Sequence, residues 1–131
     1  MFWFQLQFLR RSLYYNFTML YTRDQDPIVG HSFETFVTEE IIKGLEATLV
    51  TNWDVTYFRT KGGAEIDLIL DGPFGILPIE IKHGSMVPRR NLTTITKFVK
   101  DYNLPFGIVV NQGDAVRWLS REIIQIPVSY I

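Results

Sequence analysis

Cysteine is absent from the 131-residue chain, and histidine occurs only twice. The absence of cysteine excludes disulfides, zinc–thiolate sites and cysteine nucleophiles. Two histidines are too few for most histidine-rich metal sites, so we expect any metal ion to be bound by carboxylate groups. Carboxylate ligands suit hard cations such as Mg²⁺ or Mn²⁺.

Long apolar runs and a large excess of charge are missing as well. The sequence has no run of about 18 or more apolar residues, so we expect no transmembrane helix, no membrane partner and a cytoplasmic location. A net charge of −1 gives no global signal for nucleic-acid binding. No Gly-x-x-x-x-Gly-Lys-Ser/Thr phosphate loop occurs, so we expect no ATP site in this chain.

Basic residues are nevertheless concentrated in one segment. From Lys82 to Lys100 the chain has five lysines and arginines and no acidic residue. The segment is equally consistent with a solvated helix face and with a surface that binds phosphates. The candidates for contact with a nucleic-acid backbone are Arg59, Lys61, Arg89, Arg90 and Lys97.

Residues 1–26 differ in composition from the rest of the chain, because the first 20 of them are rich in aromatic side chains. Arg10 and Arg11 interrupt the apolar stretch, whereas a signal peptide has its positive charge in front. We expect an N-terminal arm or linker, either in a small independent protein or left by truncation or rearrangement of a longer gene. Exposed aromatic side chains would favour self-association through this arm.

Residues 27–131 have the patterns of one mixed domain of helices and strands. Apolar residues at helical spacing predict a helix over residues 31–49, with Phe33, Phe36, Val37, Ile41, Ile42, Leu45 and Leu49 on its apolar face. Pro88 opens a second helix that extends to Tyr102. The strand-like segments are Val55–Thr60, Ala64–Asp71, Ile76–Lys82, Phe106–Asn111, Val116–Leu119 and Ile123–Pro127. A helix between two strands implies a crossover, so we predict the α/β class with a mixed sheet flanked by helices.

Acidic residues occupy unusual positions in three of these elements. Glu34 lies near the centre of the apolar face predicted for the first helix, where a carboxylate needs a partner, a metal ion or a raised pKa. Its alternative role is to favour the helix N-terminus through the dipole. Alternation places Glu65, Asp67 and Ile69 on one face of the second strand, and Glu80 and Lys82 on one face of the third.

These acids suggest a site for a divalent cation. Converging carboxylates repel one another, and Mg²⁺ or Mn²⁺ held by Asp67, Glu80 and the Ile81 backbone carbonyl would relieve the repulsion. Glu34 would complete the site directly or through water. The Lys82 ammonium would orient an attacking water or stabilise charge on a phosphate, which suits phosphodiester hydrolysis.

The motif Asp67 followed by Glu80-Ile-Lys82, after a helical Glu34, resembles the PD-(D/E)XK nuclease superfamily and its αβββαβ restriction-endonuclease-like core. Gly30-His-Ser-Phe-Glu-Thr-Phe-Val37, Tyr57 to Asp67 and Pro78-Ile-Glu-Ile-Lys82 resemble one group more narrowly. That group is the domain of unknown function found C-terminal to the AAA+ module of prokaryotic ATP-binding proteins. The resemblance implies Glu34, Asp67, Glu80 and Lys82 as active-site positions.

Two functions therefore follow as hypotheses. The first is a nuclease-like domain that hydrolyses DNA phosphodiester bonds with Mg²⁺ or Mn²⁺. The alternative is a catalytically silent module, derived from the C-terminal part of an AAA+ ATPase, that binds nucleic acid or protein. A structural network of ion pairs, formed by Lys82 with Asp67 and Glu80, would also account for the charged cluster without any metal ion.

Overall fold

The computed structural model describes residues 29–131, with side chains described from Phe33 onward. The predictions for the N-terminal segment, residues 1–26, fall outside the described residues. The elements follow one another as α2 (Val29–Glu46), β1 (Asp54–Arg59), β2 (Glu65–Gly72), β3 (Gly75–Ile81), the 3₁₀ helix η1 (Arg89–Leu92), α3 (Thr93–Asp101), β4 (Gly107–Asn111), β5 (Arg117–Trp118), β6 (Ile123–Pro127) and the 3₁₀ helix η2 (Val128–Tyr130).

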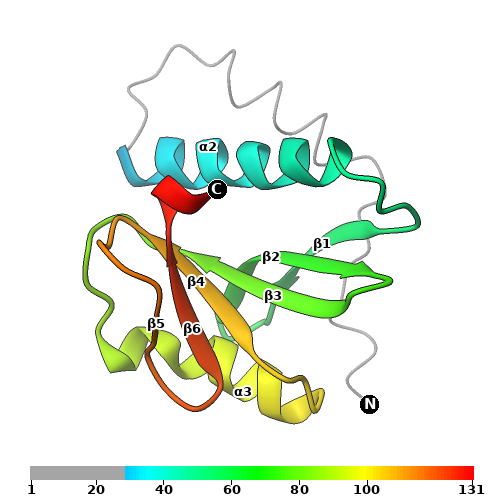
Figure 1. Ribbon diagram of the computed structural model, residues 1–131. Helices are drawn as coiled ribbons and strands as arrows, with labels where there is room; N and C mark the ends of the chain where they lie inside the picture. Colours follow the sequence, from blue (N-terminus) through cyan, green and yellow to red (C-terminus); the bar gives the residue numbers. More distant parts are fainter. Residues whose placement is uncertain (1–28) are drawn as a thin grey trace.

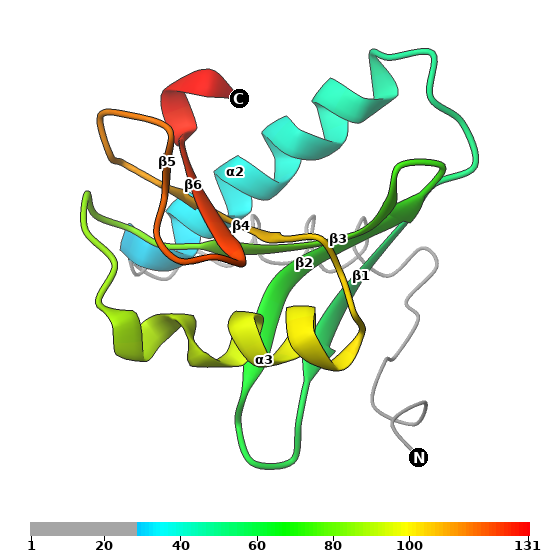
Figure 2. The same cartoon turned by 60° about the horizontal axis from the view of Figure 1, so that its bottom comes forward.

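The strands form one mixed sheet of six strands in the order β1-β2-β3-β4-β6-β5. The first three strands are joined by antiparallel hairpins, whereas β3 pairs with β4, and β4 with β6, in parallel. The α2 helix lies across one face of the sheet and α3 across the other, which gives three layers (Figures 1 and 2). The predicted α/β class and the crossover through the second helix are therefore confirmed.

The core is divided by the sheet into two sides. On the α2 side, Val37 packs against Leu68, Leu70, Ile79, Ile81 and Val110. On the α3 side, Leu92, Ile95 and Val99 pack against Val109 and Ile123, and Phe98 packs against Ile66 and Ile69. Because side chains alternate along a strand, Ile79 and Ile81 on the α2 side leave Glu80 directed to the α3 side.

The packed face of α2 is narrower than the sequence predicted. Phe33, Val37, Ile41 and Leu45, spaced by four residues, contact the core, whereas the Phe36 side chain is 53% exposed. The helix ends at Glu46, and the Thr48 hydroxyl donates a hydrogen bond to the Leu45 carbonyl at 2.7 Å. The predictions that the helix reaches residue 49 and that Phe36 and Leu49 are core residues are wrong. The pattern of apolar residues does not show which of them meet the sheet.

No helix within residues 29–131 has both the length and the apolar character needed to cross a membrane.

The close approach of α3 to β4 depends on Gly107. A Cβ atom at this position would lie 3.0 Å from two side-chain atoms of Ile95 and 3.1 Å from Val99. We expect Gly107→Ala to lower the free energy of unfolding by about 1–3 kcal/mol, because the added methyl overpacks this contact. Gly44→Ala is the matched control, since a Cβ there meets nothing within 4 Å, and it should raise stability by about 0.5–1 kcal/mol. Urea unfolding of both variants measures these changes. A change of the same sign in the free energy of unfolding of both variants would contradict the expectation.

Candidate functional site

The centre of the site is an ion pair at the end of β3. Glu80 and Lys82 are two residues apart on this segment, and Lys82 Nζ lies 2.8 Å from Glu80 Oε2. The Glu80 side chain is only 4% exposed, whereas the Lys82 side chain is 35% exposed. The backbone N–H of Lys82 donates to the Val110 carbonyl of β4 at 2.9 Å, so pairing with β4 continues past the end of β3. The predicted common face of Glu80 and Lys82 is confirmed.

β2, the strand that carries Asp67, is irregular at this residue. Thr56 of β1 lies opposite Ile69, but Phe58 lies opposite Ile66, so Asp67 and Leu68 together face the single residue between Thr56 and Phe58. This two-against-one arrangement is a β-bulge, a feature that redirects side chains.

The bulge changes which residues of β2 share a face. Ile66 and Ile69 both pack against Phe98 on the α3 side, although they are three residues apart. Strict alternation would have placed them on opposite faces. The prediction that Glu65, Asp67 and Ile69 lie on one face is therefore wrong, because the extra residue in β2 interrupts the alternation.

The Asp67 carboxylate joins β2 to β3. Asp67 Oδ2 accepts a hydrogen bond from the backbone N–H of Ile81 at 2.7 Å. The regular ladder between the two strands ends at the pair Leu68 and Ile79, and its continuation would place Asp67 opposite Glu80. The side chain of Asp67 thus takes the place of a backbone acceptor where the regular ladder ends, beside Glu80.

Burial dominates the electrostatics of the two acids. Removal from water raises the pKa of Glu80 from 4.5 to about 7, against the hydrogen bond from Lys82, and the negative charge of Asp67 adds to the increase. Burial also raises the pKa of Asp67, although the hydrogen bond from Ile81 and the charge of Lys82 oppose it. Both carboxyl groups therefore ionise less readily than exposed acids, even with the Lys82 ammonium close by.

The pKa of Lys82 is also raised, which in a lysine favours the charged form. Loss of water by itself lowers the pKa of Lys82, but the hydrogen bond and charge of Glu80, with the charges of Asp67 and Glu34, outweigh it. The pKa of Lys82 is therefore raised, and the side chain stays a cation at neutral pH. The charges of Glu80, Asp67 and Glu34 therefore all act on Lys82.

Glu34 reaches this group from α2. It is half-buried and directly follows Phe33, which packs against the core. Its charge contributes to the raised pKa of Lys82. The ring of Phe33 also meets His83 edge-on at a centroid distance of 5.4 Å, which ties this part of α2 to the residue after Lys82.

The basic residues predicted to contact nucleic acid are spread over several elements. Arg59 is paired with Glu65 of the neighbouring strand at 2.8 Å, and Lys61 lies exposed in the turn between β1 and β2. Arg89 and Arg90 are exposed in η1, seven and eight residues after Lys82. Lys97 is paired with Asp101 on α3. The structure thus does not gather these five residues into one cluster.

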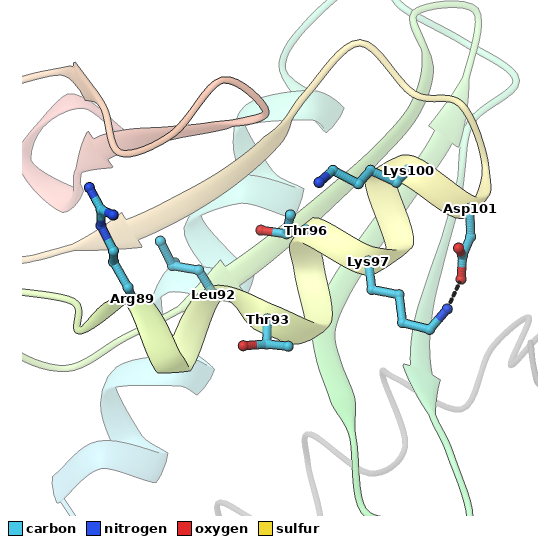
Figure 3. Close-up of a pocket in the computed structure, with 7 residues that line it drawn as sticks. All are labelled: Arg89, Leu92, Thr93, Thr96, Lys97, Lys100 and Asp101. Carbon is cyan, nitrogen blue, oxygen red and sulfur yellow. Dashed lines mark hydrogen bonds and ion pairs between the residues drawn. The ribbon is translucent and has the colours of Figure 1, made fainter.

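Arg89 and Lys97 do share a shallow groove of about 420 Å³ on the outer side of α3 and η1. Its other lining residues are Leu92, Thr93, Thr96, Lys100 and Asp101. Arg89 lies at one end of the groove and the pair of Lys97 with Asp101 at the other (Figure 3). Lys100 is also 3.8 Å from Glu122, so two of the three cations in the groove already have acidic neighbours.

Two buried amides near the site were not found by the sequence reasoning. Asn111 at the end of β4 is fully buried and donates to Gln125 Oε1 of β6 at 3.0 Å. Gln125 Nε2 in turn donates to the Ala115 carbonyl at 3.0 Å. The available signal was an amide within each of two otherwise apolar runs, Gly107–Asn111 and Ile123–Pro127.

The oxygen atoms available as metal ligands at this site suit a hard cation, but there are few of them. Asp67 and Glu80 supply carboxylate oxygens from adjacent strands, and the Ile81 carbonyl belongs to the residue between Glu80 and Lys82. Among the side chains described from Phe33 onward, no three histidine or acidic side chains are placed together as ligands for one ion. An ion bound here would thus take most of its remaining ligands from water, as Mg²⁺ commonly does.

The raised pKa of Glu80 gives a prediction about stability. Above pH 4.5 the unfolded chain loses the Glu80 proton, whereas the folded chain keeps it up to about pH 7. Glu80 therefore lowers the free energy of unfolding by about 3 kcal/mol as the pH rises across this interval.

Glu80→Gln removes the titration and should be more stable than wild type at pH 8, with little difference at pH 4. Urea unfolding at both pH values tests this, with Glu46→Gln, a change at an exposed acid of α2, as control. Equal pH dependence in wild type and Glu80→Gln would contradict the burial argument.

Comparison with known proteins places the domain in a family. One family model matches residues 29–131, the same residues that form the three layers described above. A search of curated proteins gave no match. Because the family match covers well over half of the sequence, the chain belongs to the family described as "Domain of unknown function (DUF4143)".

Proposed function

We propose that residues 29–131 form a metal-dependent nuclease domain of the PD-(D/E)XK type, which hydrolyses phosphodiester bonds in DNA. The observation that carries the proposal is the convergence of Asp67, Glu80 and Lys82 at the end of β3. The order α2, β1, β2, β3, α3, β4 agrees with the αβββαβ core of that superfamily. A buried acid with a raised pKa, next to a second acid and a lysine, is typical of sites that do chemistry.

Asp67 and Glu80 would hold Mg²⁺ or Mn²⁺. One oxygen of Asp67 accepts from Ile81, and one oxygen of Glu80 contacts Lys82. The second oxygen of each carboxylate would bind the cation, together with the Ile81 carbonyl and water, and Glu34 would act through a water molecule. When bound, the cation would supply a Lewis acid that lowers the pKa of a ligated water and offsets phosphate charge.

Lys82 would act as a positively charged hydrogen-bond donor. Its raised pKa keeps the ammonium protonated at neutral pH, so it is unsuited to remove a proton from water. An ammonium contact instead stabilises negative charge that develops on a phosphate oxygen, or orients the water that attacks it. The pair with Glu80 keeps the ammonium in place before substrate binds.

Contacts to the DNA backbone would come from both sides of the site. Arg89 and Arg90 in η1 follow the segment that leaves Lys82, and Lys61 lies at the tip of the hairpin that carries Asp67. The hairpin of β1 and β2 extends past α3 (Figure 2). Such contacts to phosphates would position a duplex without reading its sequence.

A second candidate function is a binding module without catalysis, derived from the C-terminal part of an AAA+ ATPase. The pair of Glu80 with Lys82 satisfies both charges without a metal ion. The described residues also provide no set of three acidic or histidine ligands. These two observations favour a domain that keeps the nuclease fold and binds nucleic acid or protein.

Metal binding is the first test. At pH 8, where Glu80 is ionised, we expect calorimetry to detect millimolar or tighter binding of Mn²⁺ to the wild type. Asp67→Ala should lose this binding, because one of the two carboxylates is removed. Asp71→Ala is the matched control, since Asp71 is an exposed acid on the same strand. No binding by the wild type at millimolar Mn²⁺ would contradict the nuclease proposal.

Plasmid nicking separates catalysis from binding. We expect Lys82→Ala to bind Mn²⁺ but to nick supercoiled DNA about a hundredfold more slowly, the usual effect of losing one donor to the transition state. Lys43→Ala, which removes an exposed lysine of α2, should nick at the wild-type rate. Wild-type protein that binds Mn²⁺ and DNA without nicking would instead support the binding module.

A further inference from the structure

The backbone just after Lys82 is hydrogen-bonded to one residue, Gln112, in the turn that follows β4. The backbone N–H of Gln112 donates to the Gly84 carbonyl at 2.9 Å. The Gly84 N–H donates in return to Gln112 Oε1 at 3.0 Å. One residue thus satisfies both backbone groups of Gly84, which has φ +109° and a conformation that favours glycine.

Gln112 is itself fixed by the buried amides beside it. Asn111 Oδ1 accepts from the Gly113 N–H at 3.0 Å, and Asn111 Nδ2 donates to Gln125. A Cβ atom on Gly113 would lie 2.7 Å from Gln125 Nε2, so the turn after Gln112 packs closely on the buried amides and leaves no space for a side chain here. No buried side-chain nitrogen or oxygen in the described part of the chain lacks a hydrogen-bond partner, and this small network is therefore complete.

The geometry relates this network to the ion pair. Two fixed points hold the backbone around Lys82. One is the hydrogen bond from the Lys82 N–H to the Val110 carbonyl, and the other is the pair of hydrogen bonds between Gly84 and Gln112. Both fixed points belong to the end of β4 and its following turn. The backbone of residues 82–84 is therefore tied to β4 at each end, although β3 has already ended at Ile81.

We propose that Gln112 is a positioning residue for Lys82. Its reciprocal contact with Gly84 holds the strand end so that the Lys82 ammonium remains on Glu80. A lysine side chain loses conformational entropy when it is held against Glu80. A backbone that is already tethered leaves fewer conformations to be lost when this contact forms. Gln112 contacts neither acid, so its effect on Lys82 is transmitted through the backbone of residues 82–84. The consequence for catalysis, though not the positioning itself, rests on the proposed nuclease function.

The simpler role of Gln112 would be that of an exposed glutamine in a surface turn. Exposed amide side chains are usually solvated and can be replaced with little effect. The Gln112 side chain instead accepts a backbone N–H that lies 28 positions earlier in the sequence. A glutamine that was merely solvated in a turn would not make this long-range contact with the segment that carries Lys82.

Lysine footprinting of the full chain tests the positioning directly. The acylation rate of each lysine by an N-hydroxysuccinimide ester is measured by peptide mass spectrometry in wild type, Gln112→Ala and Gln112→Glu. In Gln112→Ala we expect Lys82 to react about fivefold faster, the change in an equilibrium that follows from one lost hydrogen bond. Gln112→Glu keeps an acceptor for the Gly84 N–H and should restore the wild-type rate. Lys43 and Lys61 serve as internal references, and Ser85→Ala, an exposed change in the same loop, is the control.

The outcomes separate the inference from the proposed function. An unchanged Lys82 rate in Gln112→Ala, or an equal increase at Lys43 and Lys61, would overturn the positioning role. If the wild type nicks DNA, Gln112→Ala should nick more slowly with unchanged Mn²⁺ affinity. A parallel loss of Mn²⁺ affinity would also overturn the inference. If the wild type does not nick, the nuclease proposal fails, but the acylation rate of Lys82 still decides whether Gln112 positions it.

Discussion

The contact between Glu80 and Lys82 constrains the rest of the site. A carboxylate that is only 4% exposed is costly to ionise, and the adjacent ammonium is its nearest opposite charge. The strand end that carries both residues is hydrogen-bonded to its neighbours on both sides. Three sets of contacts restrain this short segment: the pairing of Lys82 with Val110, the hydrogen bond from the Ile81 N–H to Asp67, and the contacts of Gly84 with Gln112. The site is thus built on backbone restraints as much as on its charges.

The bulge in β2 shows how the sheet accommodates a second acid. In a regular strand, Asp67 would follow the alternation, and the Ile81 N–H would find a backbone acceptor on β2. The extra residue interrupts this pattern, and the carboxylate accepts the bond instead. The hydrogen bond therefore stabilises the ionised form of Asp67, whereas burial opposes it. A local irregularity of the backbone thus supplies a carboxylate beside Glu80 without leaving a buried N–H unpaired.

The order of elements followed from periodicity, but the details that depend on tertiary pairing did not. Helical spacing located α2, and alternation correctly placed Glu80 with Lys82. Hydrophobicity alone could not show that Phe36 faces solvent, because the packed line of α2 is set by the sheet beneath it. Alternation also failed across the bulge at Asp67 and Leu68. The amide pair of Asn111 and Gln125 needs the knowledge that β4 lies beside β6, which the order of residues does not contain.

A metal ion in the proposed site would use the same carboxylate that already forms the ion pair with Lys82. With a pKa of about 7, Glu80 is only partly ionised at neutral pH even with Lys82 beside it. A divalent cation would displace the remaining proton and share the carboxylate with the ammonium, so metal affinity should increase with pH. Lys82 would then be partly released from Glu80 and become available to a phosphate. In the proposed nuclease, Glu80 and Lys82 would form a closed pair without metal and would hold a cation and a phosphate with it, provided that the backbone after β3 keeps the lysine within reach.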